Sequence, residues 1–133
     1  METLTVASQV FDFQIKNHVL FAGWSNSVSV ESPQFMESIK HLFYVAAEYN
    51  ITRILIDSGT PSGGALTEDL VNLVQKYLPT VQPERIALLE SPDFHWDNNL
   101  FQVLKYLKTA LNMSFEIRSF STRSLAQEWL YSL

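Results

Sequence analysis

This sequence contains no cysteine and little of what marks fibrous, disordered or membrane-spanning chains. The absence of cysteine excludes disulfides, thiolate metal ligands and thiol nucleophiles together. Only four residues are glycine and five are proline, too few for a collagen-like or linker-rich chain. No apolar run approaches the roughly 18 residues that a transmembrane helix needs. Hydrophobic residues make up 47% of the chain and charged residues 17%, a balance that argues against intrinsic disorder.

Basic residues are also few, and they are scattered. Nine Lys and Arg stand against 14 Asp and Glu, so the net charge is −5. Proteins that bind nucleic acids or anionic membranes usually cluster their basic residues, so we expect neither partner. The residues from Met1 to Thr5 lack the basic and apolar segments of a signal peptide, and we therefore expect a cytoplasmic protein.

Hydrophobic periodicity predicts strands and helices that alternate along the chain. Strands are predicted over 11–16, 18–24, 51–56, 85–89 and 115–118. Helices are predicted between Ser32 and Asn50, between Thr67 and Pro79, between Asp97 and Asn112, and after Ser121. The turn Asn17-His18 indicates an antiparallel N-terminal hairpin, whereas strands separated by helices should run parallel. We expect one α/β domain over 1–133, a mixed and mostly parallel sheet of about five strands with about four helices. The strand over 115–118 alternates in polarity, as an edge strand does.

Three stretches carry a resemblance to a known family. They are Val19-Leu20-Phe21-Ala22-Gly23, then Ile54-Leu55-Ile56-Asp57, and finally the segment from Phe120 to Leu130, which reads F-S-x-x-x-x-A-x-x-W-L. With this order of elements, the chain resembles the STAS-like domains related to bacterial anti-sigma-factor antagonists, in particular an uncharacterised subgroup of that fold. The resemblance implies a STAS-like α/β fold, a final helix over the third stretch, and a non-enzymatic regulatory or ligand-binding module.

The better-known antagonists of this family carry a serine that a partner kinase phosphorylates. That serine lies in an Asp-Ser-Ser-Gly-like motif at the start of the helix after the central strand. Here the corresponding loop offers Asp57-Ser58-Gly59 and Ser62-Gly63 without an intact match. Asp57 and Ser58 fall at the end of the predicted strand rather than at a helix start, so the phosphorylation switch is not carried over.

The loop from Ser58 to Gly64 holds three of the four glycines and joins a buried strand to a helix. Ligands of open α/β sheets bind beyond the carboxyl ends of the strands, where helix N-termini offer free N–H groups. The loop matches no P-loop, and Glu68 and Asp69 at the helix start would repel a phosphate. It is therefore either a flexible connector or a binding loop. The binding interpretation uses Asp57, Ser58, Ser62 and Gly63.

The segment from Asp93 to Asp97 is the second candidate. Asp93, His95 and Asp97 stand at i, i+2 and i+4, a spacing that could supply metal ligands or a histidine oriented by a carboxylate. Neither of the other two histidines is tied to this segment by spacing. In the structural interpretation, Asp97 caps the next helix while Phe94 and Trp96 anchor the loop. We favour that interpretation, and we predict no metal and no cofactor.

Our leading hypothesis is a non-catalytic module that binds a protein partner, itself or a small apolar ligand. It depends on the resemblance and on the lack of a complete catalytic set, since no G-x-S-x-G nucleophile motif is present. Most aromatic residues fall on predicted core faces, but Phe94, Trp96 and Tyr106 could line a pocket or a subunit contact. The alternative is a small enzyme or phosphate-binding protein that uses the loop from Asp57 to Gly64 together with His95. The candidate binding residues are Asp57, Ser58, Ser62, Gly63, His95 and Trp96.

Overall fold

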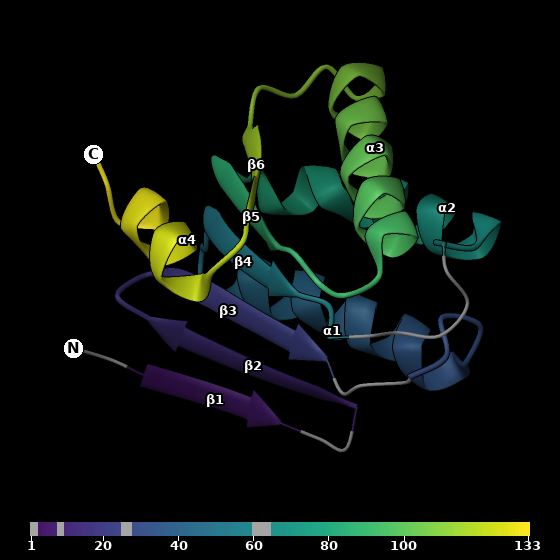
Figure 1. Ribbon diagram of the computed structural model, residues 1–133, viewed down its shortest axis with the longest axis horizontal. Coiled ribbons are helices and arrows are strands. Elements are labelled where there is room, and N and C mark those ends of the chain that lie inside the picture. The colour runs from purple at the N-terminus through teal and green to yellow at the C-terminus, as the bar shows by residue number, and fades with distance from the viewer. Residues whose placement is uncertain (1–2, 8–9, 25–27, 60–64) are drawn as a thin grey trace.

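The computed structural model describes residues 3–7, 10–24, 28–59 and 65–133 and shows one sheet flanked by helices (Figure 1). The elements are β1 (Thr3–Ala7), β2 (Phe11–Lys16), β3 (Val19–Trp24), α1 (Pro33–Glu48), β4 (Arg53–Asp57), α2 (Glu68–Val81), β5 (Arg85–Leu89), α3 (Phe94–Ala110), β6 (Glu116–Phe120) and α4 (Arg123–Leu130). Six strands form the sheet in sequential order, from β1 to β6. Pairing is antiparallel from β1 to β3 and parallel from β3 to β6. The predicted mixed α/β fold, its antiparallel hairpin and its edge strand β6 are confirmed, and β1 adds a strand to the predicted sheet.

The β2–β3 hairpin has the turn that its sequence predicts. Asn17 and His18 adopt φ of 49° and 66°, the left-handed conformation that a two-residue type I′ turn requires at both positions. The turn sets the register, which places Phe13 opposite Ala22. Because a slip of one residue would turn every side chain to the other face, this register decides which side chains enter the core.

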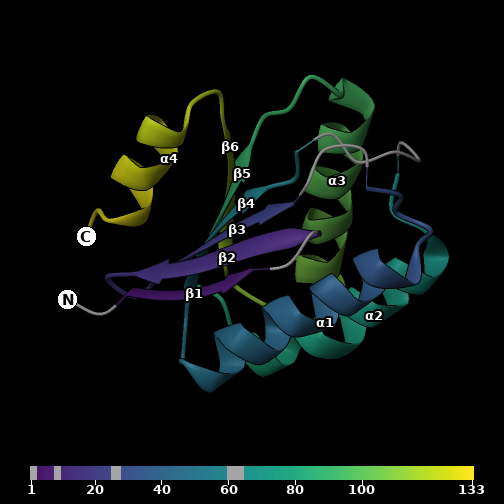
Figure 2. The same ribbon diagram turned by 90° about the horizontal axis from the view of Figure 1, so that it is seen from below.

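The helices are divided unequally between the two faces of the sheet. Figure 2 shows α1, α2 and α3 on one face and α4 alone on the other. The larger core, on the three-helix face, includes the side chains of Phe13, Leu20, Ile54, Ile86 and Trp96. The smaller core, under α4, is made by Val19, Phe21, Leu55, Ala87, Ala126 and Leu130. Since α4 packs on β4, β5 and β6, the polar face of β2 lies beside this helix rather than beneath it.

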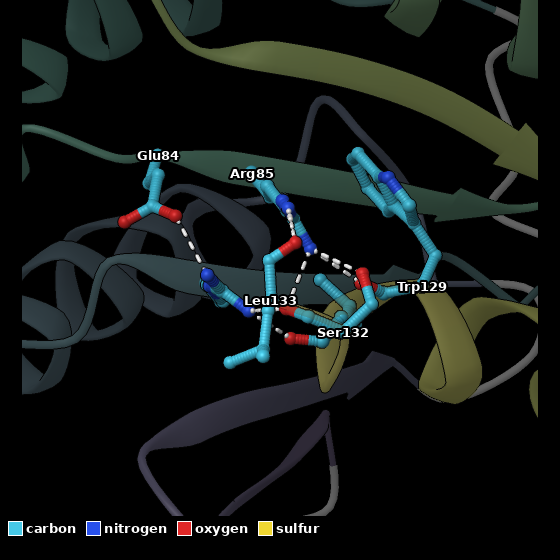
Figure 3. A network of polar contacts seen from close by, with 7 residues as sticks. Glu84, Arg85, Trp129, Ser132 and Leu133 are labelled. Carbon is cyan, nitrogen blue, oxygen red and sulfur yellow. Dashed lines mark hydrogen bonds and ion pairs between the residues drawn. The ribbon is translucent and has the colours of Figure 1, made fainter.

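Two arginines of the central strands hold the end of α4 (Figure 3). Arg53 donates to the main-chain oxygens of Leu130 at 2.8 Å and Ser132 at 2.6 Å. Arg85 donates to the main-chain oxygen of Trp129 at 2.7 Å and to the Ser132 hydroxyl at 2.7 Å. The last carbonyls of a helix lack intrahelical partners and carry partial negative charge, so two guanidinium groups stabilise this end of α4.

The predicted end of the second helix at Pro79 is wrong. Pro79 lies inside α2, which continues to Val81 and ends where Gln82 turns into the left-handed conformation at φ 53°. Pro79 is exposed, so the carbonyl that loses its amide partner can bond water instead. Pro83, directly after the cap, is the proline that prevents the helix from continuing.

Two predicted helix caps are also wrong. The N-cap of α3 is Asp93 rather than Asp97, and the N-cap of α4 is Thr122 rather than Ser121. In both helices the cap has an extended backbone, and its side-chain oxygen accepts a hydrogen bond from the amide three residues on, at 3.0 Å and 3.3 Å respectively. Several polar residues near each helix start could serve as the N-cap, and only the backbone conformation decides which one does. Among the described helices, none is both long enough and apolar enough to cross a membrane.

Candidate functional site

A polar groove lies on the α4 side of the sheet, between the β2–β3 hairpin and α4. We call it the hairpin groove. Its volume is about 560 Å³. The polar side chains that line it come from three parts of the chain and are Asp12, Gln14, Lys16, Asp57, Arg123 and Gln127. Of these, only Asp57 was predicted from the sequence as a site residue.

Two carboxylates flank Gly23 in this groove. Asp12 pairs with Gly23 across β2 and β3, and Gly23 pairs with Asp57 across β3 and β4. Residues that pair across adjacent strands point to the same face, so both aspartates face the groove with no side chain between them. A Cβ on Gly23 would meet the main-chain oxygens of Asp12 at 3.6 Å and Asp57 at 4.0 Å, which is ordinary contact. Glycine is thus not required by close packing here, and its effect is to leave space above β3.

Asp57 is held in place by the turn that follows its strand. Its Oδ1 accepts a hydrogen bond from the backbone N–H of Gly59 at 3.2 Å. Gly59 has φ of 66°, which glycine adopts at no steric cost. This local turn ends β4 and orients the carboxylate at the carboxyl end of the strand, where the sequence predicts it.

Arg123 is the cation that α4 contributes to the hairpin groove. It is the first residue of α4, and its guanidinium carbon lies 5.3 Å from the centre of the Phe21 ring. Such stacking stabilises the guanidinium without using its N–H donors. In the described part of the chain, Arg123 forms no ion pair with Asp12 or Asp57, so its donors face the groove without a carboxylate partner.

A second, apolar cavity lies on the three-helix face of the sheet. It measures about 60 Å³, and Ser58 and Trp96 both line it among apolar side chains. Ser58 is 5% exposed and Trp96 is 2% exposed. The indole Nε1 of Trp96 is buried and has no hydrogen-bond partner among the residues that the structure describes. We call this space the Ser58–Trp96 cavity. The structure thus brings together two of the predicted residues, while Asp57 faces the opposite side of the sheet.

His95 does not join either space. It is exposed near the start of α3, and its ring lies 6.2 Å from that of Phe94, measured between centroids. No hydrogen bond joins it to Asp57 or Ser58 within the described residues. The predicted binding residues Ser62 and Gly63 lie outside the described residues.

The carboxylates beside His95 serve the helix start. Asp97 accepts hydrogen bonds from the backbone N–H of Ser91 at 2.7 Å and from its hydroxyl at 2.8 Å, while Asp93 is the N-cap. No group of three or more metal-binding side chains is found in the ranges that the structure describes. The Asp-His-Asp spacing therefore builds a helix N-terminus here, with the cap one turn earlier than predicted.

Sequence reasoning missed most of the hairpin groove. In the sequence, the alternation of Asp12, Gln14 and Lys16 with apolar residues marks the polar face of β2, so these three residues could have been predicted. Arg123 and Gln127 carried no such signal, because they reach β2 only through the placement of α4.

Comparisons with known protein families, with curated proteins and with solved structures each found no match to this chain. The fold itself defines an α/β protein with a mixed six-stranded sheet.

Proposed function

We propose that this protein is a non-catalytic binding module of the STAS-like type, which holds a segment of a partner protein in the hairpin groove. The observation that carries the proposal is the groove itself, about 560 Å³ in volume and lined by polar side chains from β2, β4 and α4. Volumes of this size accommodate ligands as large as a few amino-acid residues. A cytoplasmic location is part of the proposal, and fractionation of native cells tests it.

The charges in the hairpin groove favour a peptide over a simple ion. Asp12 and Asp57 oppose Lys16 and Arg123, so the groove has no excess of either sign. A phosphate group would meet the two carboxylates, and a metal ion would meet the two cations. A polypeptide offers amides, carbonyls and side chains of both signs, and it can match this mixture point by point.

The order of the elements supports the STAS-like type. The resemblance implies a final helix over the stretch that ends at Leu130, and α4 occupies Arg123–Leu130. In the family an Asp-Ser-Ser-Gly-like motif follows the central strand, and here β4 ends at Asp57 beside the groove, although the motif itself is not intact. The hairpin groove therefore includes the end of β4, the strand that the resemblance identifies as the central one.

Site-specific photocrosslinking in native cells tests the proposal. A benzophenone amino acid at Gln14, inside the groove, should give a discrete crosslinked species that the Asp57→Asn and Arg123→Ala backgrounds weaken. The matched control is the same group at Gln75, which is exposed on α2 on the opposite face. Equal crosslinking from both positions, or none from Gln14, would count against a partner in the groove.

A second candidate ligand is a small apolar molecule in the Ser58–Trp96 cavity. The unpartnered Nε1 of Trp96 favours it, because a buried donor without a partner is costly and a ligand acceptor would satisfy it. Titration with short alcohols, which suit a space of about 60 Å³, followed by thermal unfolding, tests this candidate. Binding should raise the melting temperature of the native chain and do so less in Trp96→Phe, which lacks the donor.

A further inference from the structure

We propose that β6 pairs with β6 of a second copy of this chain, antiparallel, about a two-fold axis that passes through Ile117. The sheet would then continue from one copy into the other. β6 is the last strand of the sheet, so one of its edges has no strand partner in the described chain. An edge strand presents a row of N–H and C=O groups that can pair with another strand.

The hydrogen bonds to β5 show which residues of β6 face the open edge. The backbone N–H of Glu116 donates to Glu84 at 3.0 Å, and the carbonyl of Phe120 accepts from Glu90 at 2.9 Å. Backbone groups of a strand alternate in direction, so Glu116, Arg118 and Phe120 bond β5. Ile117 and Ser119 therefore direct their N–H and C=O groups at the open edge. An axis through Ile117 lets the two copies of this residue exchange both hydrogen bonds.

This register also pairs opposite charges. With Ile117 opposite itself, Glu116 of each copy lies opposite Arg118 of the other. Both pairs occupy non-hydrogen-bonded positions, where the Cα atoms approach to about 4.5 Å. The two side chains are exposed and already lie 3.5 Å apart within one copy, so four charges would alternate in sign around the axis. Opposite charges in such cross-strand positions are stabilising, and like charges are destabilising.

The neighbouring registers lack this match. An axis through Glu116 would place two glutamates opposite each other, and an axis through Arg118 would place two arginines opposite each other. The guanidinium carbon of Arg118 lies 5.1 Å from the ring centre of Trp129, a contact that favours this position of the side chain. The pattern of charges therefore selects one symmetric pairing and disfavours those one residue away. Such self-complementarity points to a second copy rather than to an unrelated chain.

The surface beside β6 has apolar groups that this pairing would cover. A groove of about 760 Å³ runs between α3 and β6 and is lined by Phe94, Phe101 and Ile117 among others. Phe94 is 75% exposed. A two-fold axis perpendicular to the sheet keeps both α3 helices on the same face, so the two grooves would meet across the axis. Burial of these side chains would add to the backbone hydrogen bonds and the charge pairs.

A charge swap tests the pairing. Sedimentation velocity of the native chain at micromolar concentrations should show a dimer, and Arg118→Glu or Glu116→Arg should raise its dissociation constant by at least about tenfold. The double variant Glu116→Arg with Arg118→Glu restores the opposite pairs and should restore the dimer. Arg118→Glu also loses the Trp129 contact, but the double variant loses it too, so rescue isolates the charge pairing. Glu116→Arg leaves that contact intact and serves where Arg118→Glu fails to fold.

A disulfide trap tests the register in this cysteine-free chain. Ile117→Cys should form a covalent dimer under mild oxidation, because directly opposed Cα atoms at about 5.5 Å suit a disulfide. Ser119→Cys is the matched control, since its two copies would lie more than about 12 Å apart in this register. A monomeric native chain, a dimer indifferent to both charge reversals, or equal trapping by the two cysteines would each overturn the proposal.

Discussion

Trp24 donates a hydrogen bond from its indole Nε1 to the hydroxyl oxygen of Ser38 at 2.7 Å, within the larger core. Ser38 is 0% exposed, and its hydroxyl in turn donates to the Phe35 carbonyl at 2.5 Å. The bond joins the end of β3 to the middle of α1. It contrasts with Trp96, whose Nε1 has no partner within the described ranges although both indoles border the Ser58–Trp96 cavity.

Ser38→Ala should destabilise the fold by about 1–3 kcal/mol, because it leaves the buried Trp24 N–H without an acceptor. Urea unfolding measures the change in the free energy of unfolding. Ser114→Ala, at an exposed position before β6, is the control and should change it by less than about 0.5 kcal/mol. Equal stability of the two variants would show that the Trp24 bond contributes nothing net.

Arg85→Ala should loosen α4 from the sheet. The variant removes the hydrogen bonds to Trp129 and Ser132 and the stacking of the guanidinium on the Trp129 ring at 5.4 Å. We expect a loss of about 1–3 kcal/mol, the range for hydrogen bonds to charged groups. Hydrogen exchange should report it as faster exchange in α4 than in α1. Arg85→Lys keeps the charge without the planar set of donors, so exchange in its α4 should be faster than in the native chain and slower than in Arg85→Ala. Uniformly faster exchange in all helices would contradict a local anchoring role.

His95→Ala and Asp93→Ala should differ, although the two residues are neighbours in the segment. Asp93 caps α3 through a bond to the Trp96 amide at 3.0 Å, so its removal should cost about 0.5–2 kcal/mol. His95 is exposed and should be replaceable within about 0.5 kcal/mol. Thermal and urea unfolding give both values. The enzyme alternative makes a different prediction for His95→Ala, namely loss of a turnover by orders of magnitude with stability intact.

Tyr131 should make stability depend on alkaline pH. Burial raises the pKa of its phenol above the ordinary value of 10.0, and the hydroxyl donates to the Lys16 carbonyl at 2.8 Å. As the pH rises through about 10, the unfolded chain ionises at this residue before the folded chain does, so unfolding becomes more favourable. The stability that un-ionised Tyr131 contributes is therefore fully present below about pH 10, and it is lost as the pH rises through the pKa of Tyr131 in the folded chain.

Tyr131→Phe isolates this effect. The free energies of unfolding of the native chain and the variant should differ by a constant below about pH 10 and converge above it. Tyr106→Phe, at an exposed position of α3, is the control for the change of residue type. A difference that stays constant to the highest pH at which both chains fold would contradict the assigned burial effect.

Local signals in the sequence were sufficient for most elements and for some of their ends. Asn17 and His18 specify their turn because few residues tolerate two left-handed conformations in succession. Asn50 and Asn112 stop α1 and α3 in the same conformation, with φ of 54° at each. The ends that were misplaced, at Pro79, Asp97 and Ser121, are those where a second residue of the same kind stands within four positions, namely Pro83, Asp93 and Thr122. There the choice depends on which backbone the rest of the fold imposes.

The candidate sites divide in the same way. Periodicity placed Asp57 at the end of a buried strand, but it could not show that Asp57 and Ser58 face opposite sides of the sheet toward different partners. That assignment follows from the helices that cover each face, since Asp57 lines the hairpin groove beside α4 and Ser58 lines the cavity on the three-helix face. The pairing of Asp12 with Asp57 across Gly23 likewise needs three strands aligned in one order.

By itself, the sequence determined the class of fold, because alternating apolar periods of two and about 3.6 residues leave few ways to bury their faces. It also determined the antiparallel hairpin and the strand at the edge. Only the tertiary structure decided that three helices cover one face while α4 lies alone on the other. The hairpin groove arises from that division, since it joins Asp12 to Arg123, more than a hundred positions along the chain, and no local pattern records which distant segments share a surface.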